Sequence, residues 1–483
     1  MEKRKHIHFI GICGVAMSAL ALAFHRKGYK VTGSDKGFYP PVSTHLKNAG
    51  VKYYPGWHPE KMTKDGDPDL VVVGNVAGSK NPEWLYVQEN NIEYKSYPEV
   101  IAKFFVKENS IVCAGTYGKS TSASLLSWAF KENGFEPSYM FGGISLNNMP
   151  SAKLTELAGR NGVEPCSILE GDEYKSSRWD NGPKFTHYSP THLLLTSVVW
   201  DHADVYPTEK SYVDAFEKLV KNLPKDGLLV LSAKVVHDQP YFVDLPKCNV
   251  ITYGRTKDND YQYTNVQTTK EGVTFDIYNN SNIYNIRTNC LGDYMADNMT
   301  GCFALAHQIG IEPKKIIESF KTFKNIKRRL EKHYGNGITI FDDIAHSPKK
   351  AEAVLRSIRN IYDEKIIAIF EPNSGNRRKE SVPGYGNKFV SADEVIIPRL
   401  TRIKRDPDKP APLDGQGLTD VIAQTHNNVK YINDDEELIK YLIQNTTNGD
   451  VVIFLGSHGF RGMIEQLINK LKNKQSKQKL NLL

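Results

Sequence analysis

The chain has 483 residues, of which 40% are hydrophobic and 24% are charged, a balance typical of a globular protein with about three domains. Disordered and fibrous classes are therefore excluded. Lysine and arginine exceed aspartate and glutamate by 62 − 55 = 7, which suits an anionic substrate. No basic block interleaved with aromatic residues suggests nucleic acid as a partner.

The N-terminal 35 residues predict a strand, a turn, a helix and a second strand. The apolar run after MEKRK imitates a signal peptide, but HIHFIGI, GICG, VAMSALALAFHRKG and KVTGSD together form a β-α-β pattern. No other run approaches the ~18 apolar residues that a membrane span requires, so no membrane insertion is expected. The six cysteines are scattered without a C-x-x-C pair, which favours a reducing compartment, the cytoplasm, over a disulfide framework.

Short apolar strands and helical stretches alternate along the rest of the chain, which predicts three α/β blocks in series. We place the blocks at residues 1–107, 108–325 and 326–483. Within the second block, residues 250–290 alternate apolar and polar side chains and predict an antiparallel β insertion.

The second block begins with IVCAGTYGKSTSAS, residues 111–124, which is close to a phosphate-binding loop. The usual pattern G-x-x-x-x-G-K-[ST] requires glycine where this chain has Cys113. A loop between a buried strand and a helix N-terminus still directs its N–H groups at an anion. Lys119 would add a positive charge for the phosphates of a nucleotide, and Ser120 a hydroxyl for Mg²⁺.

Two acidic segments follow later strands of the same block. LEGDEY contains Glu170, Asp172 and Glu173, and VVWDHAD contains Asp201, His202 and Asp204. Carboxylate and imidazole groups at strand ends beside a phosphate loop are where metal ligands lie in open α/β sheets. Taken singly, each side chain could equally be a surface residue or a helix cap.

Several segments together resemble the Mur ligases, in the same order and over nearly the whole chain. They are HIHFIGICGVAMSALA, VTGSD, AGTYGKST, LEGDEY, WDHAD, NIKRRLE and FDDIAHSP. Mur ligases carry the loop form G-T-x-G-K-[ST]-[ST], so Cys113 does not indicate a damaged loop. The resemblance implies an α/β fold of three-domain Mur ligase architecture, with a Rossmann-like UDP-binding domain, a central P-loop ATPase domain and a C-terminal Rossmann-like domain for the amino acid or peptide. It also implies an ATP-dependent ligase that forms an amide bond.

The resemblance further implies the substrates. Members with the GSD type of N-terminal domain use UDP-N-acetylmuramate and add either L-alanine or the tripeptide L-alanyl-γ-D-glutamyl-meso-diaminopimelate. The segments DHADVY and FEPNSGNRRKES resemble the tripeptide-adding members, which act in peptidoglycan recycling. Alanine-adding members of peptidoglycan synthesis are expected to show GIGG and a His-Arg-Tyr element where this chain has GICG and EPNSGNRR.

Roles of individual residues are carried over from the resemblance. Lys119, Glu170 and His202 would form the catalytic group, and Mg²⁺ would be held by Ser120, Glu170 and His202. ATP would be bound by Gly115, Thr116, Gly118, Lys119, Ser120, Thr121, Asn298, Arg329 and Asp343. The UDP-sugar would be bound by Gly11, Gly14, Ser34, Asp35 and Asn75, and the peptide by Asn373, Ser374, Asn376, Arg377 and Arg378.

Some positions depart from the family pattern and leave other classes of protein open. The departures are Tyr117, Ser197, Val199, Met295 and Ser347, which concern adenine and substrate positioning. A nucleotide-binding module without catalysis is one alternative. A nicotinamide dehydrogenase would rest on GICGVA, but Cys13 replaces the second glycine of that motif. Folylpolyglutamate synthetases share a similar loop but lack the UDP-type first domain.

Overall fold

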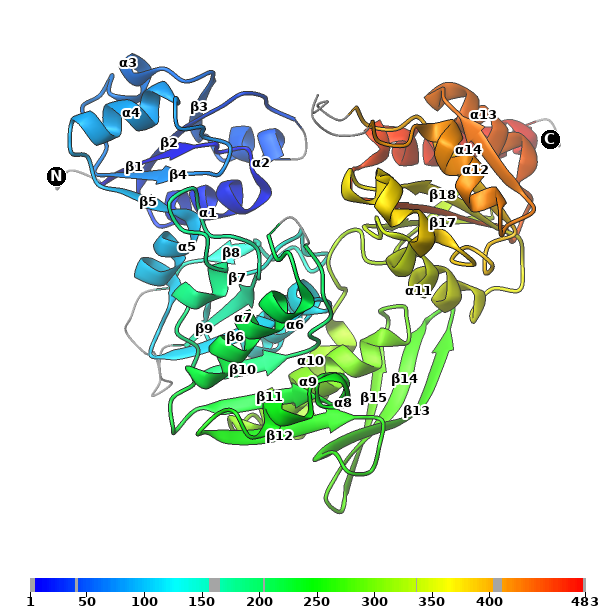
Figure 1. The fold of residues 1–483 in the computed structure, drawn as a ribbon. Coiled ribbons are helices and arrows are strands. Elements are labelled where there is room, and N and C mark those ends of the chain that lie inside the picture. Colours follow the sequence, from blue (N-terminus) through cyan, green and yellow to red (C-terminus); the bar gives the residue numbers. More distant parts are fainter. Residues whose placement is uncertain are drawn as a thin grey trace. The chain divides into compact units, whose positions relative to one another are not determined.

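The computed structural model describes residues 5–39, 42–155, 166–202, 205–335, 337–402 and 411–480. Their strands form three sheets of five, ten and six strands (Figure 1). By their contacts they divide into two units, one of residues 1–266, 274–289 and 294–325, the other of residues 267–273, 290–293 and 326–483. The first unit holds the first sheet and most of the second, and the other unit holds the third.

The first sheet is parallel, with the strand order β3-β2-β1-β4-β5. Its strands are His6–Ile10 (β1), Lys30–Asp35 (β2), Lys52–Pro55 (β3), Leu70–Val73 (β4) and Tyr94–Ser96 (β5). Its helical segments are Val15–Arg26 (α1), Val42–Asn48 (α2), Pro59–Met62 (α3), Pro82–Glu89 (α4), Tyr97–Val100 (α5) and Ile101–Phe105 (η1). Side chains alternate across the strands, so Phe9 packs with residues of α1 and α2 while Ile10 packs with residues of α3 and α4. Figure 1 shows these two pairs of helices on opposite faces of the sheet.

The second sheet has the order β15-β14-β13-β12-β11-β10-β6-β9-β7-β8. Its strands are Asn109–Ala114 (β6), Ser138–Met140 (β7), Ala152–Lys153 (β8), Cys166–Gly171 (β9), His192–Leu195 (β10), Leu228–Ser232 (β11), Asn249–Gly254 (β12), Tyr261–Thr269 (β13), Gly272–Asn279 (β14) and Asn282–Thr288 (β15). Its helical segments are Lys119–Glu132 (α6), Lys184–His187 (η2), Glu209–Lys221 (α7), Ala233–Asp238 (α8), Pro240–Val243 (η3), Tyr294–Gln308 (α9) and Pro313–Thr322 (α10).

Strands β13 to β15 extend one edge of the second sheet, where the sequence predicts a β insertion. The insertion joins the sheet by a parallel pairing between β12 and β13. At the centre of the sheet, β10, β6 and β9 are parallel neighbours. Their carboxyl ends therefore meet at one edge, where ligands bind in open α/β sheets.

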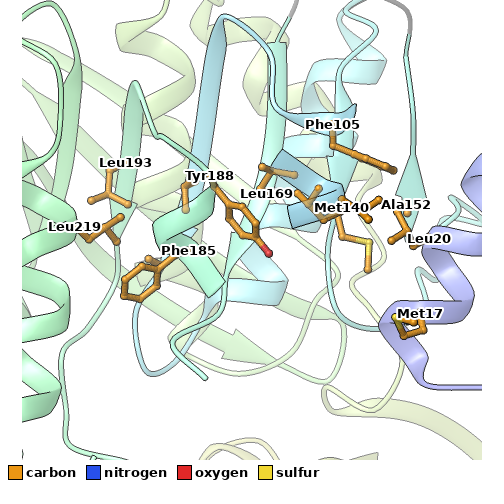
Figure 2. Close-up of a cluster of buried hydrophobic side chains, with 14 of the residues drawn as sticks. Met17, Leu20, Phe105, Met140, Ala152, Leu169, Phe185, Tyr188, Leu193 and Leu219 are labelled. Atoms are coloured by element: carbon orange, nitrogen blue, oxygen red, sulfur yellow. The ribbon is translucent and has the colours of Figure 1, made fainter. Parts of the chain in front are cut away.

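One continuous hydrophobic cluster joins the first two sheets. Met17 and Leu20 of α1 lie beside Met140 and Ala152 of β7 and β8 (Figure 2). The guanidinium of Arg26 at the end of α1 also donates to the carbonyl of Ala152 at 2.6 Å. The buried apolar area and this hydrogen bond hold the two sheets together.

The third sheet has the order β16-β17-β21-β18-β19-β20, with only β16 antiparallel to its neighbour. Its strands are Glu331–Gly335 (β16), Ile338–Asp343 (β17), Ile366–Glu371 (β18), Glu394–Pro398 (β19), Val429–Ile432 (β20) and Val451–Gly456 (β21). Its helical segments are Pro348–Arg359 (α11), Gly375–Arg377 (η4), Lys379–Tyr385 (η5), Gly415–Ala423 (α12), Asp435–Asn445 (α13), Phe460–Gly462 (η6) and Met463–Leu480 (α14). The three-domain architecture expected from the sequence is confirmed, whereas the boundaries 1–107, 108–325 and 326–483 stay predictions. None of the helices in the described ranges is both long and apolar enough to cross a membrane.

Burial of His6 on β1 predicts a loss of stability in acid. Its ring accepts or donates one hydrogen bond with Thr32 Oγ1 at 2.8 Å, and burial, with Lys30 nearby, lowers its pKa to about 4. The unfolded chain therefore takes up a proton between pH 6.5 and 4 that the folded chain excludes. Stability present above pH 6.5 should be lost as the pH falls toward 4.

We expect the His6→Gln variant to lack part of this acid sensitivity. Between pH 7 and 4, the thermal midpoint of the wild type should fall about 5 to 10 °C further than that of the variant. Calorimetry at matched ionic strength measures both. His237→Gln serves as the control, because His237 is exposed, and it should follow the wild type. Parallel curves for His6→Gln and the wild type would contradict the prediction.

Candidate active site

The loop between β6 and α6 bends at two glycines. Gly115 and Gly118 have positive φ angles of 132° and 83°, which side chains rarely tolerate. A Cβ on Gly115 would lie 2.8 Å from the backbone nitrogen of Ser197, and one on Gly118 would lie 2.5 Å from Oδ1 of Asn298. Cys113 precedes the bend and is buried within β6, so the loop conformation needs no glycine there.

The end of β10 holds this loop in place. Thr116 Oγ1 lies 2.9 Å from the carbonyl oxygen of Val199, which accepts its hydrogen bond, and 2.9 Å from the Tyr212 hydroxyl. The N–H of Tyr117 donates to the hydroxyl of Ser197 at 3.0 Å. Ser197 and Tyr117 both depart from the family pattern, and the side chain of Ser197 thus supports the backbone of Tyr117.

Lys119 begins α6 and folds back over the loop. Its Nζ donates to the carbonyl of Gly115 at 2.6 Å and lies 2.9 Å from Oε2 of Glu173. Burial opposes the charge on Lys119, but the neighbouring carboxylates, Glu173 first, raise its pKa above the ordinary value. The amine is therefore a permanent cation at a helix N-terminus, a position that favours phosphate.

A hydroxyl and a carboxylate meet beside this cation. Ser120 Oγ donates to Oε1 of Glu170 at 2.6 Å, and the N–H of Gly142 donates to Oε2 of the same carboxylate. Burial raises the pKa of Glu170, although these two hydrogen bonds act in the opposite direction. Glu170 ends up next to Ser120 because β9 and β6 are paired with Cys113 opposite Glu170.

Glu173 joins the lysine to the predicted histidine. Its carboxylate is 1% exposed, and Oε1 lies 3.3 Å from Nε2 of His202. The hydrogen bond from His202 to Glu173 raises the pKa of the histidine. The LEGDEY pattern indicates Glu173 only as one of several possible metal ligands, whereas its contacts with Lys119 and His202 follow from the fold. Asp204 lies outside the described residues.

Two other residues predicted to bind ATP lie close to this loop or within it. Thr121, in the first turn of α6, is buried. Asn298 on α9 is also buried, with its amide oxygen facing Gly118. Met295, one helical turn earlier, is fully buried and packs in the core rather than lining the loop.

The residues predicted to bind the UDP-sugar lie at or after the carboxyl ends of β1, β2 and β4, which are neighbours in the first sheet. Gly11 has a φ angle of 89°, and Gly14 precedes the first turn of α1. Asp35 accepts the N–H of Cys13 at 2.8 Å, which fixes the turn between them. Asn75 is exposed after β4.

Ser34 differs from the other residues of this group because it is fully buried. Its hydroxyl donates to Oε2 of Glu83 at 2.5 Å. Glu83 also accepts the Tyr54 hydroxyl at 2.7 Å and the N–H of His58 at 2.8 Å. The side chain of Ser34 therefore supports the end of β2.

In the third sheet, the carboxylate of Asp343 is buried at the end of β17. It accepts the N–H groups of Leu330 and Ala345, both at 2.8 Å, and burial raises its pKa. Arg329 is half-buried and lowers that pKa in part. The neighbouring Arg328 pairs with Asp342 at 3.1 Å and donates to the carbonyls that follow β21.

The predicted peptide-binding residues follow β18. Arg377 is 8% exposed, and its guanidinium donates to the carbonyls of Leu413 at 3.0 Å and Thr401 at 2.9 Å. Asn373 Oδ1 accepts from both the backbone and the side chain of Asn376. Ser374 and Arg378 are exposed, so Arg378 is the arginine of this pair that presents its charge to solvent.

The donor set beside the phosphate loop fits Mg²⁺. The described parts of the chain contain no group of three or more histidine, cysteine, aspartate or glutamate side chains arranged to hold a metal. Mg²⁺ does not need one, because it commonly binds one or two carboxylates together with water and substrate phosphates. The oxygen pair of Ser120 and Glu170 meets this requirement.

In the second sheet, the predicted phosphate loop, Lys119 and the pair of Ser120 and Glu170 meet at the carboxyl ends of parallel central strands. This arrangement defines an α/β nucleotide-dependent enzyme. The family comparisons agree. Residues 6–108 match the Mur ligase family, catalytic domain; residues 113–306 match the Mur ligase middle domain; and residues 328–458 match the Mur ligase, glutamate ligase domain. The chain belongs to the Mur ligase family and is an ATP-dependent ligase.

The relatives of the chain include two kinds of UDP-N-acetylmuramate ligase. The UDP-N-acetylmuramate–L-alanyl-γ-D-glutamyl-meso-2,6-diaminoheptandioate ligase of Haemophilus influenzae is 29% identical over 97% of this chain and all of its own length. The UDP-N-acetylmuramate–L-alanine ligase of Desulfitobacterium hafniense is also 29% identical, over 94% of this chain and 97% of its own. Among solved structures, a murein peptide ligase from Psychrobacter arcticus is 26% identical, with a TM-score of 0.70 over 97% of this chain and 99% of its own.

Proposed function

We propose that this ligase joins UDP-N-acetylmuramate to the tripeptide L-alanyl-γ-D-glutamyl-meso-diaminopimelate, as in peptidoglycan recycling. The supporting observation is the match to the Haemophilus influenzae tripeptide ligase over 97% of this chain and all of that protein, together with the exposed Arg378 after β18. A cytoplasmic location fits the proposal, because all six cysteines are free thiols.

The geometry supports an acyl phosphate route. The lactyl carboxylate of the sugar attacks the γ-phosphorus of ATP, the bond to the β-phosphate oxygen breaks, and ADP leaves. The amine of the peptide then attacks the acyl carbon, loses a proton, and displaces phosphate to form the amide. Lys119 and the loop amides would neutralise charge on the transferred phosphoryl group.

Mg²⁺ would be held by Ser120 and Glu170, with His202 at a second position, and when bound it neutralises phosphate charge. Glu173 would orient both Lys119 and His202, because its buried carboxylate contacts each of them. The turn from Gly11 to Gly14 and the side chains of Asp35 and Asn75 would bind the UDP-sugar.

Addition of L-alanine in place of the tripeptide is the second candidate, because alanine ligases match this chain at the same identity. A phosphate-release assay with ATP and UDP-N-acetylmuramate, offering L-alanine and the tripeptide in parallel, separates the two. We expect kcat/KM to be higher for the tripeptide. A kcat/KM for free L-alanine equal to or above that for the tripeptide would instead indicate that the enzyme adds L-alanine.

The metal roles of Glu170 and His202 predict a dependence on metal concentration. In Glu170→Gln and His202→Ala, the Mg²⁺ concentration for half-maximal activity should rise by at least ~10-fold, because each change removes a ligand. Titration with Mg²⁺ and Mn²⁺ during phosphate release measures this. Glu209→Gln, an exposed change on α7, should leave the titration unchanged. A loss of activity that no metal concentration reverses, accompanied by a lower thermal midpoint, would indicate structural roles instead.

A further inference from the structure

Three aromatic side chains from distant parts of the chain meet within the first unit. Trp179, from the segment after β9, lies with its ring centroid 5.4 Å from that of Trp84 and 5.4 Å from that of Tyr94. Trp84 belongs to α4 and Tyr94 to β5 of the first sheet (Figure 1). The contact therefore ties the second sheet's acidic segment to the first sheet.

Trp179 lies at the tip of a compact loop. The N–H of Ser176 donates to the carbonyl of Gly182 at 2.8 Å, and that of Ser177 donates to the carbonyl of Asp180 at 2.9 Å. Asp180 in turn binds His187 at 2.7 Å. These hydrogen bonds connect the tip of the loop to its base.

The base of the loop carries the carboxylates of the active site. Glu173 contacts Lys119 and His202 as described, and Asp172 pairs with Lys184 at 2.5 Å. The N–H of Lys184 also donates to the carbonyl of Tyr174 at 3.1 Å, which closes the loop. Glu173, which contacts Lys119, therefore directly precedes a closed loop whose tip carries Trp179.

Trp84, the partner of Trp179 in the aromatic contact, is connected to the predicted UDP-sugar site. Trp84 follows Glu83 directly, and the fully buried Glu83 accepts hydrogen bonds from Ser34 and Tyr54. Ser34 and the neighbouring Asp35 end β2. A continuous series of contacts thus runs from the end of β2, through α4 and Trp179, to Glu173.

We propose that Trp179 is a positioning residue: by docking on Trp84 and Tyr94 it seats the loop that brings Glu173 to Lys119, and so couples the UDP-sugar site to the phosphate site. The part of this inference that concerns coupling rests on the proposed function. Aromatic rings prefer particular relative orientations in addition to the stabilisation from burial. Such a contact can therefore fix the orientation of the loop.

Hydrogen exchange of the enzyme without substrates tests the seating. In Trp179→Ala, amides of residues 174–184 should exchange at least ~10-fold faster, while β9 keeps its protection. Trp179→Phe should stay within a few-fold of the wild type, because it keeps an aromatic ring. Tyr241→Ala is the matched control, since Tyr241 is 40% exposed and Trp179 is 41% exposed. Unchanged exchange in Trp179→Ala would overturn the proposal.

Steady-state kinetics test the consequence for the reaction. We expect Trp179→Ala to lower kcat by roughly 10- to 100-fold, as for a small misplacement of catalytic groups, with rescue by Trp179→Phe. The double variant Trp84→Ala/Trp179→Ala should be no slower than the slower single variant, because both remove the same contact. A kcat equal to that of Tyr241→Ala, or fully multiplicative losses in the double variant, would refute a positioning role.

Hydrogen exchange in the presence of the sugar nucleotide tests the coupling between the UDP-sugar site and the loop. Saturating UDP-N-acetylmuramate should slow exchange of residues 174–184 in the wild type but not in Trp179→Ala. If calorimetry shows that the wild type does not bind this sugar nucleotide, the proposed function fails, while the exchange results without substrate still decide whether Trp179 seats the loop. If the wild type binds it and exchange in the loop does not change, the coupling is refuted.

Discussion

Replacing Lys119 with alanine is expected to lower kcat by about 10³-fold or more while leaving the affinity for UDP-N-acetylmuramate nearly unchanged. Lys119 is the permanent cation at the start of α6, and loss of such a group removes several kcal/mol of charge stabilisation from phosphoryl transfer. The predicted sugar site lies on the first sheet, whereas the loop follows β6 of the second sheet. Phosphate release gives kcat, and calorimetry gives the sugar affinity.

The ion pair between Lys119 and Glu173 requires a separate control. Removing the lysine breaks the buried ion pair and leaves His202 as a remaining charged contact of the Glu173 carboxylate. Breaking a buried pair typically costs about 3–5 kcal/mol of stability. The double variant Lys119→Ala/Glu173→Gln should therefore recover thermal stability without recovering turnover. Lys131→Ala, at the exposed end of the same helix, should match the wild type. Recovery of turnover in the double variant, or a joint loss of sugar binding, would contradict the assigned role.

The strands, the phosphate loop and the family could be predicted from the sequence because their signals are local. Buried parallel strands appear as short apolar runs, and Gly115, Gly118, Lys119 and Ser120 are close together in the chain. The role of Glu173 could not be predicted in this way. Its contacts depend on the register of β9 against β6 and on the path of the segment that carries His202, both of which are set by tertiary packing.

The sequence also does not distinguish the contacts of neighbouring residues of one chemical type. Arg328 and Arg329 are indistinguishable in NIKRRLE, yet Arg328 makes the hydrogen bonds to the segment after β21. Ser34 resembles a ligand in GSD, yet its hydroxyl binds Glu83. Which hydrogen bonds such a side chain makes follows from packing that a local pattern does not contain.

The departures from the family pattern can now be given physical roles. Ser197 stands where the family usually has asparagine, and its hydroxyl binds the loop N–H of Tyr117. Val199 stands where glutamate is common, and its carbonyl and N–H both pair with Thr116 Oγ1. These substitutions preserve backbone support of the loop, so they do not by themselves argue for an inactive nucleotide-binding protein.

Replacement of Arg377 and of Arg378, the two arginines after β18, should affect different properties of the enzyme. Arg378→Ala should raise the KM for the tripeptide by roughly 10- to 1000-fold and spare the KM for ATP, if its exposed guanidinium binds a peptide carboxylate with the ~1.5–4 kcal/mol of a charge-assisted pair. Arg377→Ala should instead lower the thermal midpoint, because the buried guanidinium holds the carbonyls of Thr401 and Leu413.

Steady-state kinetics and calorimetry on the same preparations distinguish these effects. Lys379→Ala is the control for a general loss of positive charge, because Lys379 is the exposed neighbour of Arg378. Equal increases in KM for Arg378→Ala and Lys379→Ala would indicate attraction of an anionic peptide without a specific contact. An unchanged KM for the tripeptide in Arg378→Ala would remove this arginine from the peptide site, since long-range screening cannot hide the loss of a direct ion pair of that strength.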